Sequence, residues 1–314
     1  MTNRISKWIT IVASLVLANA AYAQDMPTAA PNQLAELQWL SLPSDVSVGR
    51  DGQVFVVDGG NHQVAVFDST GLRISSLGVM GSKEGQFLSP LGIGVSRNGE
   101  LYVADKGNGR IVMFNAKGEH QRTFALTADG VDIDPIDVAV GLQGRELYVT
   151  TNTTHQVVVF SNRGQYLRSW GGEGDDDGKF RYPATIDVDD KGNVYVVDTL
   201  NARVQKFDGL GEHLQTIGKR GGKPGTFYRP KGVAVDATGK IYVSDSFLGV
   251  IQVFTPAGEF AYALGENGVA AVFDTPTGME TAGSRLLVVE MLPGRVALLE
   301  PRPPLPVVEE GSGE

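Results

Sequence analysis

The side chains best suited to chemistry are basic and aromatic residues that lie beside two prolines in the second half of the chain. They are Arg181 and Tyr182 before Pro183, and Tyr228, Arg229 and Lys231 around Pro230. Arginine can hold a carboxylate through two parallel hydrogen bonds, and tyrosine offers a stacking face and a hydroxyl donor. We expect these five residues to bind an anionic group, such as a peptide terminus or an acidic glycan. The alternative is that they are ordinary loop charges that balance Glu173, Asp175, Asp176 and Asp177.

Four acidic residues form a second candidate group. Asp187 and Glu280 lie four residues after a proline, where equivalent segments have a small residue, and Asp45 and Asp137 lie two residues after a proline. If these segments surround an axis, the four carboxyl groups line a channel and offer oxygens to water or to a divalent cation. No calcium-loop spacing accompanies them, so we expect no metal, cofactor or catalytic group.

The four histidines are not spaced as a metal-ligand set. His62 and His155 occupy equivalent positions, and His120 and His213 occupy a different pair of equivalent positions. We expect the two pairs at opposite ends of the fold, where they cannot converge on one ion. The sequence contains no cysteine, which excludes disulfides and thiolate chemistry. It also lacks the H-E-x-x-H, G-x-S-x-G and phosphate-loop signatures.

A repeated unit positions these candidates between about Leu42 and Glu300. Each copy opens with a proline, at intervals of 45 to 48 residues: Pro43, Pro90, Pro135, Pro183, Pro230 and Pro276. Each also contains four short alternating runs separated by Gly-containing turns, which predicts a four-stranded antiparallel sheet. A period of this length is typical of a propeller blade. The sequence therefore predicts an all-β fold, a six-bladed β-propeller of four-stranded antiparallel blades.

Two further features of the repeat concern its stability. The sixth unit lacks a fourth strand, and we expect the run Glu36–Leu40 to supply it, so that an N-terminal strand closes the ring and removes two exposed sheet edges. An aspartate recurs at the end of the second strand, as Asp58, Asp105, Asp198 and Asp245. Because a residue needed in most blades usually solves a structural problem, we expect these aspartates to cap loops and to pair with Arg110 or Arg203.

The segments YVVDTLNARVQKF (195–207) and LYVADKGNGRIVMF (101–114) resemble NHL repeats. The resemblance extends over about 42–300 and is looser in the third unit, where Thr151 and Gln156 replace the aspartate and arginine. Peptide-amidating lyases use a related six-bladed propeller whose zinc histidines directly follow the blade-opening proline. The corresponding residues here are Ser44, Leu91, Ile136, Ala184, Lys231 and Thr277. None is histidine, so we expect that zinc-dependent activity to be absent.

The ends of the chain predict export. Residues 1–23 have a basic start, an apolar stretch and a small-x-small cleavage site, which together indicate a signal peptide. Residues 24–33 are expected to be a flexible leader, 34–300 the propeller, and 301–314 a disordered, Pro-rich and acidic tail. The formal charge is −9, and removal of Arg4 and Lys7 with the signal leaves −11. Such an acidic chain is a poor nucleic-acid ligand.

These features predict an exported, periplasmic or extracellular protein that is a monomer with no membrane span. We expect the long loops to form one face of the propeller and to bind a protein, peptide or glycan partner, because loops on a rigid scaffold commonly carry function. The alternative is a metal-dependent lyase or lactonase-like enzyme that uses the channel carboxylates Asp45, Asp137, Asp187 or Glu280.

Overall fold

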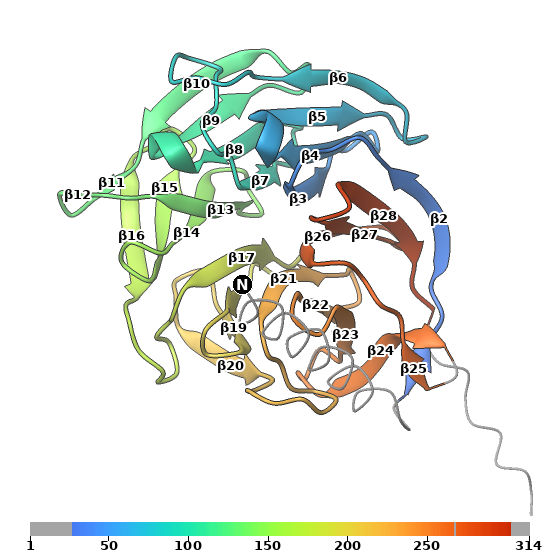
Figure 1. The fold of residues 1–314 in the computed structure, drawn as a ribbon. Helices are drawn as coiled ribbons and strands as arrows, with labels where there is room; N and C mark the ends of the chain where they lie inside the picture. The colour runs from blue at the N-terminus through green and yellow to red at the C-terminus, as the bar shows by residue number, and fades with distance from the viewer. Residues whose placement is uncertain (1–26, 267, 303–314) are drawn as a thin grey trace, which may run out of the picture.

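The chain forms a ring of six antiparallel β-sheets around a central channel (Figure 1). The computed structural model describes residues 27–266 and 268–302. The predicted all-β, six-bladed propeller with four-stranded antiparallel blades is confirmed. The helical elements of the described residues are two short 3-10 turns, Gly59–Asn61 and Lys106–Asn108. No helix in this part of the chain is long and apolar enough to cross a membrane.

The first three blades follow one another along the chain, each from its inner to its outer strand. The first contains β3 (Pro43–Val48), β4 (Val54–Asp58), β5 (Gln63–Phe67) and β6 (Arg73–Leu77). The second contains β7 (Gly92–Val95), β8 (Leu101–Asp105), β9 (Arg110–Phe114) and β10 (His120–Ala125). A small hairpin, β11 (Thr127–Ala128) and β12 (Val131–Asp132), precedes the third, which contains β13 (Pro135–Val140), β14 (Glu146–Thr151), β15 (Gln156–Ser161) and β16 (Tyr166–Gly171).

The last three blades include the N-terminal strands. The fourth contains β17 (Pro183–Val188), β18 (Val194–Asp198), β19 (Arg203–Phe207) and β20 (His213–Ile217). The fifth contains β21 (Pro230–Val235), β22 (Ile241–Asp245), β23 (Val250–Phe254) and β24 (Phe260–Glu266), extended by β1 (Thr28–Ala29) and β25 (Val269–Ala270). The sixth contains β26 (Pro276–Ala282), β27 (Arg285–Glu290), β28 (Arg295–Glu300) and the outer strand β2 (Asn32–Leu37).

An N-terminal strand closes the ring, as predicted. The strand β2 pairs antiparallel with β28, from Asn32 opposite Glu300 to Leu37 opposite Val296. It ends earlier than the expected run Glu36–Leu40, since Trp39 has a left-handed backbone (φ 66°) and an 86% exposed side chain.

The expected leader, residues 24–33, also differs from the structure where it is described. The strand β1 pairs parallel with β24, and β2 already begins at Asn32. These pairings cover the outer edges of the fifth and sixth blades, whose backbone groups would otherwise lack partners. The expected signal peptide, residues 24–26 and the tail beyond Arg302 lie outside the described residues.

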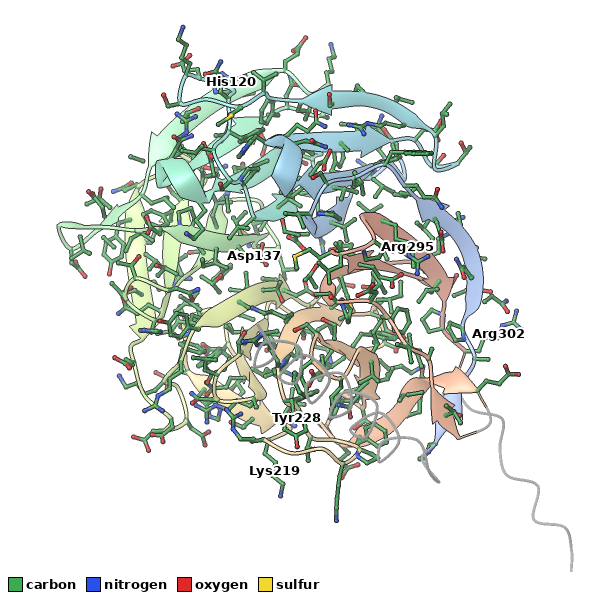
Figure 2. The ribbon with its side chains drawn as sticks, viewed as in Figure 1. His120, Asp137, Lys219, Tyr228, Arg295 and Arg302 are labelled. Carbon is green, nitrogen blue, oxygen red and sulfur yellow. The ribbon has the colours of Figure 1, made fainter. Side chains whose placement is uncertain are left out.

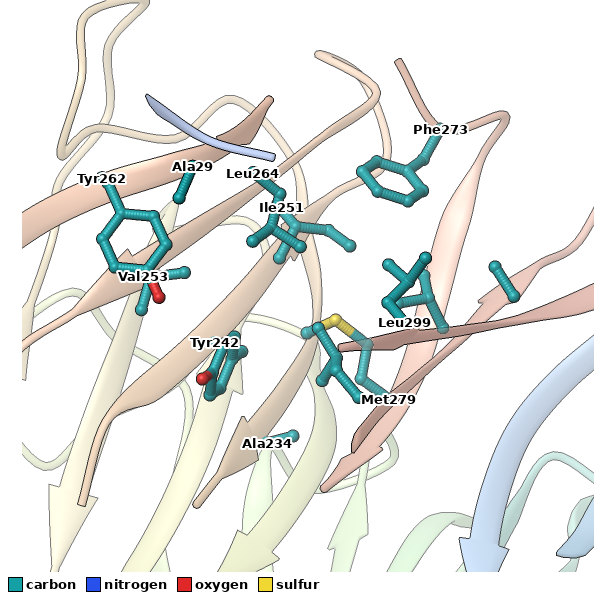
Figure 3. Close-up of a cluster of buried hydrophobic side chains, with 13 residues drawn as sticks. Ala29, Ala234, Tyr242, Ile251, Val253, Tyr262, Leu264, Phe273, Met279 and Leu299 are labelled. Carbon is teal, nitrogen blue, oxygen red and sulfur yellow. The ribbon is translucent and has the colours of Figure 1, made fainter. Parts of the chain in front are cut away.

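The hydrophobic core is divided into six main clusters, each sandwiched between two neighbouring blades. Figure 3 shows the cluster between the fifth and sixth blades, where Tyr242 and Ile251 of one face Met279 and Leu299 of the other. Because each blade buries both of its faces only against neighbours, a single unit cannot form a core of its own. Closure of the ring therefore completes the last cluster, between the sixth and first blades.

The inner strands approach one another so closely that glycine is required between them. A Cβ atom on Gly232 would lie 2.0 Å from the carbonyl oxygen of Thr277, and one on Gly278 would lie 2.1 Å from Asp45 Oδ1. Such distances are far inside van der Waals contact. The glycines therefore let the first strands crowd around a narrow axis.

Truncation of Leu37 tests the importance of ring closure. Leu37 is 1% exposed and belongs to the cluster between the sixth and first blades. We expect Leu37→Ala to lower the free energy of unfolding by about 2–5 kcal/mol, because it creates a cavity in that cluster. Chemical denaturation followed by far-UV circular dichroism measures this change. Leu34→Ala is the control on the same strand: its side chain is 48% exposed, and the expected change is within about 0.5 kcal/mol. Equal effects would mean that β2 does not close the core.

Candidate functional site

The long loops are organised by the acidic residue that ends the second strand of a blade. Asp198 is buried; one carboxylate oxygen accepts the Arg181 backbone N–H at 2.7 Å, and the other accepts Arg203 Nε at 2.8 Å. Asp105 makes the equivalent bonds to the Leu88 N–H and to Arg110 Nε, both at 2.7 Å. The predicted role of these aspartates as loop caps paired with arginine is confirmed.

The histidines also hold loops. The Nδ1 atoms of His62 and His155 accept the backbone N–H groups of Ser89 and Tyr182, at 2.9 and 3.0 Å. His120 and His213 each bond a threonine hydroxyl of their own outer strand, Thr123 and Thr216. The described residues contain no group of three or more His, Asp or Glu side chains arranged to hold a metal ion.

The residues that directly follow the six blade-opening prolines line one cavity, which we call the mouth cavity. These residues are Ser44, Leu91, Ile136, Ala184, Lys231 and Thr277. The cavity has a volume of about 280 Å³ and is also lined by Asp45, Asp137, Arg229 and Met291. Figure 2 shows Asp137 beside the central channel. Lys231 is the single ionisable residue among the six that follow the prolines, so one blade alone places a charge in this ring.

The structure separates the five residues expected to bind an anion. Arg229 and Lys231 line the mouth cavity, whereas Arg181, Tyr182 and Tyr228 do not. The Tyr182 ring contacts His155 edge-on, with 5.0 Å between ring centroids. The Tyr228 ring packs on Phe247 at 5.3 Å and lies away from the channel, over the fifth blade (Figure 2). Two cations therefore share the cavity, and the tyrosines occupy loops outside it.

The two cations in the mouth cavity have no acidic partner. No carboxylate in the described ranges forms an ion pair with Arg229 or Lys231, whereas Arg110 and Arg203 pair with buried aspartates. Burial lowers the pKa of the Lys231 amine, and the positive charge of Arg229 lowers it further. The two cations thus form no salt bridge with the described residues and are available to an anion, in a cavity that Asp45 and Asp137 also line.

The four channel acids lie in two layers. Asp45 and Asp137 line the mouth cavity, while Asp187 and Glu280 line a second cavity of about 170 Å³. The two layers correspond to the positions two and four residues after the prolines, which point the same way along a strand. A Cβ atom on Gly92 would lie 2.2 Å from Asp137 Oδ1, so the glycine of the second blade makes room for the acid of the third.

Three of these acids join the inner strands of neighbouring blades. Asp45 accepts the Ile93 N–H at 2.9 Å, Asp137 accepts the Ile186 N–H at 2.9 Å, and Asp187 accepts the Val235 N–H at 2.8 Å. Asp45 and Asp137 also lie close enough for the negative charge of Asp137 to raise the pKa of Asp45. These three acids therefore link the inner strands of neighbouring blades.

Burial raises the pKa of all four channel acids. It raises the pKa of Asp137 and of Asp187 to about 6. The pKa of Asp45 lies well above its ordinary value because of burial and the negative charge of Asp137. Burial, then the charges of Asp187 and Asp137, also raise the pKa of Glu280 well above its ordinary value. Burial, with repulsion between the acids as a smaller cause, thus keeps part of this set protonated near neutral pH.

Sequence reasoning missed the apolar and hydroxyl side chains of the mouth cavity. Leu91, Ile136 and Met291 provide apolar walls, and Ser44 and Thr277 provide hydroxyl groups. The signal was present, because four of these five residues directly follow the repeated proline. Met291 follows Glu290, the sixth-blade copy of the recurrent acid, and its place in the cavity could not be inferred from the repeat.

Comparison with known families identifies repeats in three of the blades. The NHL repeat matches residues 40–67, 87–114 and 180–207. These segments contain the first three strands of the first, second and fourth blades, with the loops before their prolines. No curated protein matches the chain at a significant level.

Solved structures of other propellers are similar in fold. Virginiamycin B lyase from Staphylococcus aureus, solved with quinupristin, superposes with a TM-score of 0.60 at 15% identity, over 82% of this chain and 80% of that one. A gluconolactonase from Xanthomonas campestris gives a TM-score of 0.64 at 15% identity, over 88% and 95% of the two chains. Kuenenia stuttgartiensis hydrazine synthase gives 0.58 at 11% identity, over 83% and 96%. At these identities the similarity shows the fold alone.

The raised pKa values of the channel acids predict a stability that falls with increasing pH. The folded chain keeps protons that the unfolded chain releases above about pH 4, so unfolding becomes easier as the pH rises through about 6 and beyond. Glu280→Gln removes one of these groups. We expect the variant to be more stable than the parent at about pH 8 by about 1 kcal/mol or more, and the difference to shrink at about pH 5.

Thermal and chemical unfolding across that pH range measure the effect. Glu259→Gln, at an exposed position on an outer hairpin, serves as the matched control and should leave the slope unchanged. A parent protein whose stability rises steadily from about pH 5 to about pH 8 would contradict the protonated channel.

Proposed function

Because the chain carries NHL repeats and folds as a six-bladed β-propeller, we propose that it is a binding module for a protein, peptide or glycan. Its long-loop face would hold the partner through an anionic group. The observation that carries the proposal is the pair Arg229 and Lys231, two cations that line the mouth cavity with no ion-paired carboxylate in the described part of the chain. By contrast, an arginine that lies five residues after the recurrent acid is paired with that acid, as Arg203 is with Asp198.

The shape and lining of the mouth cavity suit one end of a partner. Arg229 keeps its charge at all physiological pH values and can hold a carboxylate with two hydrogen bonds. Leu91, Ile136 and Met291 offer apolar contacts to the group that carries the carboxylate. Tyr182 and Tyr228, both exposed on loops of the same face, are available to stack on the remainder of a peptide or glycan.

The proposal includes export to the periplasm or the extracellular space and a monomeric state. The basic start, apolar stretch and Ala-Tyr-Ala site of residues 1–23 support export. The formal charge of −9 disfavours a nucleic-acid partner.

A metal-dependent lyase or lactonase-like activity is the second candidate, because the fold is shared with a lyase and a gluconolactonase. The channel carboxylates are the groups that would hold the metal. Two features disfavour them as ligands. In Asp45, Asp137 and Asp187, one carboxylate oxygen already accepts a hydrogen bond from a backbone N–H. Burial also favours the protonated forms of these three residues. Metal ligation needs deprotonated carboxylates.

Metal content separates the two candidates. We expect the purified protein to contain no stoichiometric divalent metal by elemental analysis. A chelator should leave its melting temperature unchanged, since a bound metal stabilises the folded state by mass action. A stoichiometric metal whose removal lowers the melting temperature would favour the enzyme.

Removal of Arg229 tests the proposed anion site. The probe is a short peptide with an apolar C-terminal residue and a free carboxylate, compared with the same peptide as its C-terminal amide. We expect the parent to prefer the carboxylate form. Arg229→Ala should weaken that binding by about 1.5–3 kcal/mol, roughly tenfold or more, because a charge-assisted hydrogen bond is lost. Isothermal titration calorimetry gives both affinities.

Lys219→Ala is the matched control for charge. Lys219 is exposed on the connection before the fifth blade and does not line the cavity. This variant should bind the peptide as the parent does. Equal binding of the acid and amide peptides, or equal losses in the two variants, would contradict a specific site at the channel mouth.

A further inference from the structure

Lys231 stands out from the other lysines of the chain by its place in the fold. It directly follows Pro230 on the inner strand β21 and is the single charged member of the ring of six residues in the mouth cavity. Its backbone is fixed on both sides, because Thr185 Oγ1 donates to the Lys231 carbonyl at 2.9 Å and the Gly232 N–H donates to Ser244 Oγ at 2.8 Å. The amine is therefore presented from a rigid strand.

The surroundings of this amine favour its unprotonated form more strongly than the surroundings of a surface lysine do. Burial and the nearby Arg229 guanidinium lower the pKa of Lys231, and no carboxylate of the described residues pairs with it to restore that pKa. Each unit by which a lysine pKa falls increases the unprotonated fraction about tenfold at neutral pH. A lysine that is desolvated and lies next to another cation is the usual setting for a nucleophilic amine.

The other groups of the cavity complement such an amine. Arg229 offers two parallel donors to a carboxylate, and Leu91, Ile136 and Met291 offer apolar walls. Asp45 and Asp137 line the same cavity, and burial keeps the pKa of Asp45 well above its ordinary value, so that its carboxyl group can supply a proton. A ligand that satisfies all three features carries a carboxylate, a reactive carbonyl beside it and a short apolar side chain.

We propose that Lys231 is a carbonyl-reactive amine that captures a 2-oxo acid as an imine, with Arg229 holding the carboxylate of the ligand. The Lys231 Nζ lone pair forms a bond to the carbonyl carbon, and the carbonyl oxygen takes up a proton from the Asp45 carboxyl group. The nitrogen returns one proton to the Asp45 carboxylate and another to the hydroxyl group, which leaves as water while the C=N bond forms. Amine and ketone thus yield imine and water, without oxidant or reductant.

This inference rests on the proposed anion site, since the carboxylate of the 2-oxo acid would occupy it. It adds a covalent step and a class of small molecule that the binding proposal does not require.

Reductive trapping on the intact folded protein tests the inference. The protein is incubated with pyruvate and cyanoborohydride near neutral pH, and the rate of modification of each lysine is measured by peptide mass spectrometry. We expect Lys231 to be modified several-fold faster than the exposed Lys219 and Lys223. Because every lysine is followed in one sample of the parent protein, the result does not depend on the folding of a variant. Modification of Lys231 at or below the rate of the exposed lysines would overturn the proposal.

Two comparisons separate this inference from the anion site. Propanal has three carbons, as pyruvate does, but no carboxylate, so Arg229→Ala should slow trapping by pyruvate more than trapping by propanal. A smaller slowing of both is expected, because loss of the Arg229 charge raises the pKa of Lys231. Lys231→Arg keeps the positive charge and removes the nucleophile; the fast modification of this segment should disappear, while Lys219 and Lys223 keep the rates measured in the parent. If Arg229→Ala abolishes peptide binding but Lys231 is not trapped, the imine is wrong and the anion site stands. If both reagents trap Lys231 equally and Arg229→Ala has no effect on either, the anion site is wrong and the 2-oxo acid proposal falls with it.

Discussion

The buried acid at the end of the second strand is the constraint on which the other features depend. In five blades this acid accepts the backbone N–H of the residue two before the blade-opening proline: Asp58 from Ser41, Asp105 from Leu88, Asp198 from Arg181, Asp245 from Tyr228 and Glu290 from Asp274. The proline has no N–H to donate, and in four blades the residue before it has a left-handed backbone. The acid therefore fixes the entry of each inner strand, and with it the ring of residues that follow the prolines.

The third blade shows what happens without that acid. Thr151 occupies the position of the aspartate, and Gln156 replaces the arginine. The connection into this blade instead contains the hairpin β11–β12, where the Ile133 N–H donates to the Leu126 carbonyl at 2.9 Å. A connection that satisfies its own backbone groups does not need a carboxylate acceptor. The weaker repeat pattern of this unit thus reflects a different solution to the same hydrogen-bonding problem, and Ile136 still lines the mouth cavity.

The repeat made the ring, its six blades and its closing strand predictable, because each follows from periodicity and from the need to cover a sheet edge. The same periodicity placed Asp45, Asp137, Asp187 and Glu280 toward the channel. The repeat could not show which basic and aromatic residues near Pro183 and Pro230 line the mouth cavity and which lie outside it. The direction of a loop side chain depends on local contacts, such as that of Tyr228 with Phe247. The start of β2 was also missed, because Asn32 and Gln33 lack strand patterning and are held by the edge of β28.

A fold shared with a lyase and a gluconolactonase leaves the chemistry of this chain open, because the scaffold offers six equivalent positions around one axis and function depends on what fills them. Here five of the six are uncharged, and the sixth is Lys231. Around it, backbone N–H groups of the next blade hold Asp45 and Asp137, which leaves these carboxyl groups less free to bind a metal ion, and burial favours their protonated forms. The channel mouth thus contains partly protonated acids and the Lys231 amine, which forms no ion pair with the described residues. Such a site is better suited to bind an anion or a carbonyl group than a cation. The deviation of a single blade from the repeat thus sets the electrostatic character of the whole channel mouth.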